Sequence, residues 1–137
     1  MEQSKEISDL ISRFYGSMEN GDIAYIDNLL SHKAEALAIG TDPQEWWAGY
    51  DTIGPVFKAQ IKEMAGIKGE ALETNAYREG TVGWGSSQLV MRLPNGKTLP
   101  MRSTAVFHQE NGSWKMIQFH LSIGVPNEEA FGGGLTV

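Results

Sequence analysis

Asp42 is the residue of this sequence with the clearest potential for chemistry. It is followed by Pro43 and stands shortly before the pair Trp46–Trp47. A carboxylate at the mouth of an apolar pocket suits general acid–base work, because desolvation moves its pKa toward neutrality. The sequence therefore predicts a catalytic role for Asp42 in proton transfer. The alternative is a turn in which Asp42 accepts backbone N–H bonds.

Three tryptophans could shape a binding site. Trp46 and Trp47 are adjacent, so one is expected to line or cover a pocket while the other packs at its rim. The alternative is that both only plug the open end of the fold. Trp84 stands between Gly83 and Gly85, which indicate a bend with close packing. We expect Trp84 in either the pocket or a subunit interface, and the sequence does not choose between them.

No metal or cofactor site is predicted. His32, His108 and His120 lack a convincing ligand spacing, and no acidic residues join them in a recognisable set. His120 is expected to form structural hydrogen bonds. The chain has no cysteine, which excludes disulfides, thiolate nucleophiles and iron–sulfur clusters. It also has no glycine-rich phosphate loop and no Gly-x-Ser-x-Gly nucleophile motif.

Composition restricts the class of protein. The 137 residues suit one domain, and 41% hydrophobic content with 9% aromatic residues is enough to build a core. Eleven basic against 17 acidic residues give a net charge of −6, so no binding to nucleic acid or anionic membranes is expected. The sequence shows neither a signal peptide nor a long apolar span, which predicts a cytoplasmic protein.

Apolar spacing predicts three helices in the first half of the chain. The first ends at Asn20–Gly21, which tolerate the left-handed conformation common at helix ends. A short second helix follows from Asp22. The third is expected to begin with Asp51 as its N-cap, to hold Pro55 in its first turn and to stop at Gly66. The clearest apolar stripe is that of the first helix: Ile7, Leu10, Ile11, Phe14 and Met18.

The second half changes to the alternation of strands. A short strand is expected at 37–39, and Asn111–Gly112 is a strong hairpin signal between two later ones. This order predicts an α+β fold with an antiparallel meander. We expect one domain over 1–125 and a flexible tail over 126–137. The four long strands are predicted at 67–78, 81–93, 97–109 and 113–125.

Residue parity separates the two faces of the last two strands. One face is almost wholly apolar and should pack under the helices. The other mixes polar groups with a tryptophan, which is typical of a subunit interface, so we expect a homodimer. A single bulge would exchange the faces of part of a strand. Parity places Met116, Val106 and His108 on the same face. The predicted interface residues are Arg102, Thr104, Trp114, Gln118, His120 and Ser122.

Three segments together resemble the SnoaL-like branch of the nuclear-transport-factor-2-like superfamily. They are Phe14–Ile23, Gly40–Gly49 and Asn111–Ser122, in this order and spacing. The resemblance implies a cone in which a curved, mostly antiparallel sheet wraps around three helices and leaves an apolar pocket. It also implies that convex sheet faces meet in dimers. Function varies widely in this superfamily, from isomerases, cyclases and dehydratases to non-catalytic association domains.

Two functions from different classes remain open. One is a cofactor-independent proton-transfer enzyme that acts on a small, mostly apolar carbonyl-type molecule, with Asp42 as acid or base. The other is a non-catalytic module that holds a small ligand or a partner. The resemblance makes ketosteroid isomerisation itself unexpected, because Phe14 stands where such members carry a tyrosine and Pro100–Arg102 supplies no carboxylic acid. The predicted pocket residues are Phe14, Tyr15, Met18, Trp46, Trp47, Phe57, Ile61, Trp84, Met101, Ser103, Phe119 and Leu121.

Overall fold

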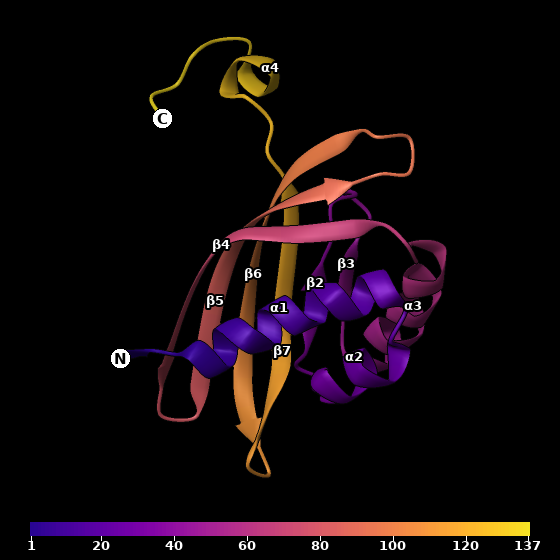
Figure 1. The fold of residues 1–137 in the computed structure, drawn as a ribbon. Coiled ribbons are helices and arrows are strands. Elements are labelled where there is room, and N and C mark those ends of the chain that lie inside the picture. Colours follow the sequence, from indigo (N-terminus) through magenta and orange to yellow (C-terminus); the bar gives the residue numbers. More distant parts are fainter.

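Four long antiparallel strands form the centre of the structure, a computed structural model that describes residues 1–137 (Figure 1). They are β4 (Lys68–Glu79), β5 (Val82–Arg92), β6 (Thr98–Glu110) and β7 (Ser113–Ile123), and each pairs with the next. Asn111 and Gly112 both have positive φ in the turn between β6 and β7, as the hairpin signal predicts. The α+β fold and its antiparallel meander are thus confirmed.

Three short strands complete a seven-stranded sheet. β1 (Glu2–Gln3) pairs with β4 at one edge, and β2 (Leu37–Ile39) runs parallel to β7 near the other. β3 (Trp46–Ala48) forms the outer edge beside β2. The strand at 37–39 is confirmed. β1 and β3 were not predicted.

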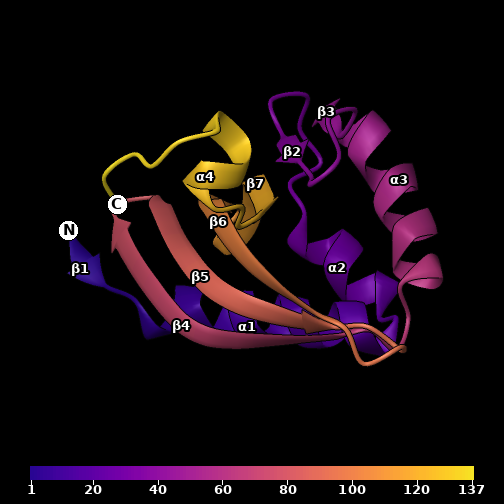
Figure 2. The same ribbon diagram turned by 90° about the horizontal axis from the view of Figure 1, so that it is seen from above.

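Helices cover one face of the sheet. α1 (Lys5–Asn20) crosses the long strands, while α2 (Ile23–Leu29) and α3 (Tyr50–Glu63) stand beside β2 and β3 (Figure 1). Gly21 ends α1 in the left-handed conformation, and the Asp22 carboxylate caps α2 by accepting the Tyr25 N–H. Figure 2 shows the curved strands on one side and α3 with β2 and β3 on the other.

The predicted start of α3 is wrong by two residues. The N-cap is Gly49, which makes no side-chain capping bond, and Asp51 lies inside the first turn. Gly49 has φ 86°, a conformation that only glycine adopts freely, so the chain geometry sets this boundary. Pro55 consequently lies in the second turn, where its ring removes one backbone N–H from the helix ladder.

The last residues contain a short helix that was not predicted. α4 (Asn127–Phe131) has no buried residue and lies beyond the end of the sheet, apart from the other helices (Figure 1). Phe131 is 71% exposed there. The flexible tail predicted over 126–137 therefore includes one regular element.

Two glycines allow α1 to lie close against β5. A Cβ at Gly83 would be 2.8 Å from Ile7 Cδ1, and one at Gly85 would be 2.5 Å from Ile11 Cδ1. The side chain of Trp84, between them, therefore points to the opposite face of the sheet. There its ring stacks on Tyr77 with centroids 6.2 Å apart. Close packing predicted from the glycines is observed.

A register irregularity changes the face assignment of β7. Val106 pairs with Gln118, but Phe107 pairs with Met116, which leaves Ile117 without a partner. Because a shift of one residue reverses every side chain beyond it, Met116 and Trp114 turn toward the core. Their exposed fractions are 2% and 7%. The prediction that Trp114 and Met116 lie on the open face of the sheet, the face that the helices leave uncovered, was therefore wrong.

Candidate functional site

One cavity of about 240 Å³ opens between the helices and the sheet. Its walls come from α1, α3, the β2–β3 hairpin and the strand ends of β5, β6 and β7, and 16 of its 20 lining residues are hydrophobic. An apolar hollow with few polar groups is the usual form of a small-molecule site. Eight of the predicted pocket residues line it: Phe14, Met18, Trp47, Phe57, Ile61, Met101, Phe119 and Leu121.

Four other predicted pocket residues lie elsewhere. Trp46 is 65% exposed at the sheet edge, since alternation along β3 turns it away from the side of Trp47. Trp84 faces the open side of the sheet, as described above. Tyr15 and Ser103 are buried and share a hydrogen bond between their hydroxyls. Burial raises the pKa of Tyr15 to about 12, so this hydroxyl stays protonated at neutral pH.

Asp42 does not face the cavity. It is exposed, and its carboxylate accepts the backbone N–H of Gln44 at 2.8 Å within the β2–β3 turn. This is the turn alternative, in which an aspartate bonds to the backbone two residues ahead. The prediction that Asp42 acts as catalytic acid or base in the pocket is therefore contradicted by the geometry.

Glu45 is the carboxylate that the sequence interpretation missed. Its Oε1 accepts the Asp42 N–H at 2.9 Å, and its Oε2 accepts a hydrogen bond from Gln60 Nε2 at 2.7 Å. Glu45 and Gln60 both line the cavity. The available signal was strand parity, because Glu45 precedes Trp47 by two positions and shares its face.

Gly40 makes room for the Glu45 side chain. A Cβ at Gly40 would lie 2.6 Å from Glu45 Oε1 and 2.9 Å from Glu45 Cβ, closer than real Cβ contacts. The Glu45 side chain therefore lies against Gly40, the residue after β2, where only a glycine leaves space. Its position is fixed by the close contact with Gly40 and by the hydrogen bonds from the Asp42 N–H and the Gln60 amide.

Methionines form a large part of the cavity wall. Four of the six in the chain line it: Met18, Met64, Met91 and Met101. Methionine side chains are unbranched and adaptable, so they suit a wall that must fit ligands of varied shape. Three of these, with Ile67, also bound a small void that reaches Tyr15. Tyr15 thus lies next to methionines that also line the cavity.

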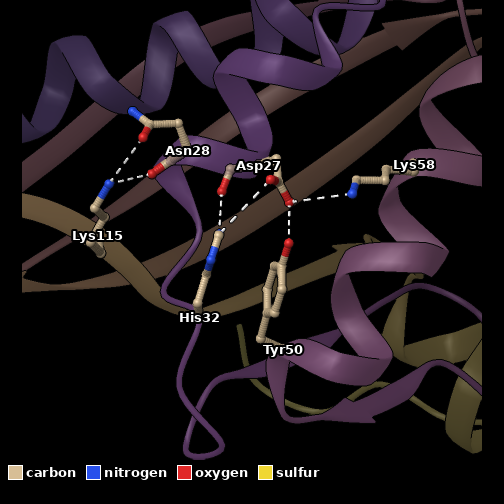
Figure 3. A network of polar contacts seen from close by, with 6 residues as sticks. All are labelled: Asp27, Asn28, His32, Tyr50, Lys58 and Lys115. Atoms are coloured by element: carbon tan, nitrogen blue, oxygen red, sulfur yellow. Dashed lines mark hydrogen bonds and ion pairs between the residues drawn. The ribbon is translucent and has the colours of Figure 1, made fainter.

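A polar network joins α2 to α3 outside the cavity (Figure 3). Tyr50 donates a 2.6 Å hydrogen bond to Asp27, and its ring stacks on His32 with centroids 3.8 Å apart. The bond to Asp27 raises the pKa of Tyr50. His32 Nε2 contacts the Asp27 carbonyl oxygen at 2.8 Å, and Lys58 lies 3.9 Å from the Asp27 carboxylate. We interpret this network as a structural link between the two helices.

Two further observations concern possible metal sites and membrane spans. No three side chains among His, Asp and Glu gather in a group that could hold a metal ion. None of the four helices is both long enough and apolar enough to pass through a lipid bilayer.

The chain belongs to the SnoaL-like domain family, which matches residues 7–126. This range covers every element described above except β1, the first residues of α1, and α4. The family assignment made from the three sequence segments is thus confirmed. No match was found among curated protein sequences.

Solved structures with the same fold belong to the NTF2-like group. An NTF2-like protein of unknown function from Pseudomonas putida KT2440 superposes with a TM-score of 0.78 at 17% identity, covering 93% of this chain and 94% of that one. A candidate dehydratase of the NTF2-like family from Streptomyces avermitilis gives 0.76 at 14% identity, covering 88% and 95%. A candidate ketosteroid isomerase from Parabacteroides distasonis gives 0.73 at 15% identity, covering 88% and 86%. At these identities the likeness establishes the fold.

Proposed function

We propose that this protein binds a small, mostly apolar molecule in the cavity between α3 and the sheet. The observation that carries the proposal is the wall itself, where 16 of 20 lining residues are hydrophobic and the polar side chains are confined to Thr41, Glu45 and Gln60. A ligand with an apolar body and one or two polar atoms matches this distribution. Burial of its apolar surface supplies the driving force, at about 25 cal/mol per Å² before association costs.

A thermal-shift screen tests this function. Small aliphatic and aromatic alcohols, ketones and amines should raise the melting temperature, because a ligand that binds only the folded state stabilises it by mass action. Leu121→Trp places a large ring in the cavity and should abolish the shift. Leu72→Trp is the matched control, because Leu72 is 62% exposed and lies outside the cavity. A screen without any shift would contradict the proposal.

The pair Glu45–Gln60 favours one catalytic function as the second candidate. A carboxylate and an amide in one cavity wall could move a proton next to a carbonyl. In a β,γ-unsaturated ketone, Glu45 would take the proton from the α-carbon, and the electron pair would move onto the carbonyl oxygen as a conjugated dienolate. The second N–H of Gln60 would donate to that oxygen, and Glu45 would return the proton to the γ-carbon, so that the double bond moves into conjugation with the carbonyl group. The substrate is then isomerised without a cofactor.

Hydrogen–deuterium exchange tests this second candidate. Small enolisable ketones should exchange the protons beside the carbonyl in deuterated buffer faster with the protein than without it, as followed by proton NMR. Glu45→Gln should remove the acceleration, and Asp42→Asn should leave it intact, because Asp42 lies outside the cavity wall. Equal acceleration by wild type and Glu45→Gln would exclude Glu45 as the base. Binding without exchange would indicate the non-catalytic function.

A further inference from the structure

The charges of the cavity wall are unbalanced. Among its 20 lining residues, Glu45 is the only one with an ionisable side chain, and no Lys, Arg or His accompanies it. Glu45 takes part in none of the ion pairs of the chain. Its two hydrogen-bond donors, the Asp42 backbone N–H and the Gln60 amide, are both neutral. The Glu45 carboxylate is therefore a negative group of the cavity wall that no cationic wall residue and no ion pair balances.

The Glu45 carboxylate also keeps hydrogen-bonding capacity for a ligand. An ionised carboxylate offers about four lone-pair sites, and the two contacts at 2.9 and 2.7 Å occupy one on each oxygen. Gly40 and Gln60 hold the side chain at the cavity wall, so a ligand need not order it on binding. The remaining sites can accept only N–H or O–H donors.

From this geometry we propose that the ligand is an apolar amine, bound with its ammonium group at Glu45 and its hydrocarbon body against the methionine and aromatic wall. A charge-assisted bond from an ammonium group to a carboxylate is stronger than a bond from a neutral hydroxyl. A carboxylate headgroup meets repulsion from Glu45 and finds no cation to pair with. The inference depends on the proposed binding function, because it names the ligand class of the same cavity.

Three ligands that share one hydrocarbon chain separate these possibilities: n-octylamine, 1-octanol and octanoate. At pH 7 octylamine is cationic and octanoate is anionic, because the pKa of an alkylammonium group is close to that of Lys and the pKa of a carboxylic acid is close to that of Glu. Isothermal titration calorimetry in buffer with moderate salt should rank octylamine at least tenfold above octanol, with octanoate weakest. The ranking on the wild-type protein alone decides the question, so it does not depend on any variant folding.

Two variants assign the preference to Glu45. Glu45→Gln keeps an acceptor for the Asp42 N–H and should lower octylamine affinity about tenfold while leaving octanol affinity nearly unchanged. Glu63→Gln is the matched control: it removes the same charge from an exposed position outside the cavity wall and should leave the ranking intact. Octanol or octanoate binding as tightly as octylamine would overturn this inference and leave the binding function standing. If none of the three binds, the binding function itself fails.

Discussion

Gln60 Nε2 on α3 lies 2.7 Å from Glu45 Oε2 on the β2–β3 hairpin, and this contact joins the two walls that enclose the cavity. Because the same carboxylate accepts the Asp42 N–H, one side chain fixes both the hairpin turn and the distance from the hairpin to the helix. The contact thus couples the stability of this region to the geometry of the proposed ligand site.

Replacing Gln60 should therefore weaken the fold measurably. Gln60→Met keeps the length of the side chain but removes the donor, and we expect a loss of about 1–2 kcal/mol in the free energy of unfolding. Urea denaturation measures this change. Gln44→Met is the control, since the exposed Gln44 side chain makes no hydrogen bond, and it should change stability by less than about 0.5 kcal/mol. Equal effects of the two variants would contradict a role for the Gln60 contact.

Gly40 should not tolerate a side chain. Gly40→Ala brings a methyl group to 2.6 Å from Glu45 Oε1, so Glu45 must leave its place and lose its bonds to Asp42 and Gln60. The expected destabilisation is about 1–3 kcal/mol by urea denaturation. Gly16→Ala has open space and a helical backbone and should instead stabilise α1 by about 0.5–1 kcal/mol. A neutral Gly40→Ala variant would show that the Glu45 position is not held.

Because of Tyr15, the free energy of unfolding should depend on pH in the alkaline range. Its folded-state pKa of about 12 lies above the ordinary value of 10.0, so its contribution is fully present below pH 10 and is lost as the pH rises toward 12. The neutral hydroxyl is buried in the folded protein, whereas the unfolded chain ionises earlier. Unfolding free energies of wild type should therefore fall between pH 10 and 12 more steeply than those of Tyr15→Phe. Parallel pH profiles for the two proteins would contradict this assignment.

The open face of the sheet remains the proposed dimer interface. Arg102, Thr104, Gln118 and His120 are exposed there in the single chain, whereas Trp114 is buried beneath Arg78 and no longer belongs to the set. Sedimentation equilibrium should give a dimer at micromolar concentration. Thr104→Glu with Gln118→Glu adds like charges across adjacent strands and should shift it to monomer. A monomeric wild type would refute the interface.

Much of the fold was predictable because the spacing of apolar residues repeats along its helices and strands. The α1 stripe and the long alternating strands each repeat over many residues, so single exceptions did not hide the pattern. Features set by one or two residues were missed. The irregularity beside Ile117 reversed Trp114, and a positive φ at Gly49 moved the start of α3. Neither has a periodic signal.

The site was predictable in its apolar part and not in its polar part. Phe14, Phe57 and Phe119 follow from stripes and parity, and all three line the cavity. Asp42 and Glu45 lie within one short hairpin, and the sequence does not show which of the two carboxylates only accepts a backbone N–H of the turn and which also lines the cavity. The structure shows that Asp42 bonds to Gln44, whereas Glu45 lines the cavity and bonds to Gln60. The position of Glu45 depends on the space at Gly40 and on Gln60, which is distant in sequence.

Methionine methyl NMR tests the central claim that the cavity binds a small apolar molecule. In protein labelled with ¹³C at the methionine methyl groups, saturating n-octylamine or 1-octanol should shift the signals of Met18, Met64, Met91 and Met101, which line the cavity. Met1, exposed at the N-terminus, and Met116, buried outside the cavity wall, should keep their positions. Unchanged spectra with both compounds, or shifts of Met1 and Met116 equal to those of the other four, would contradict the account.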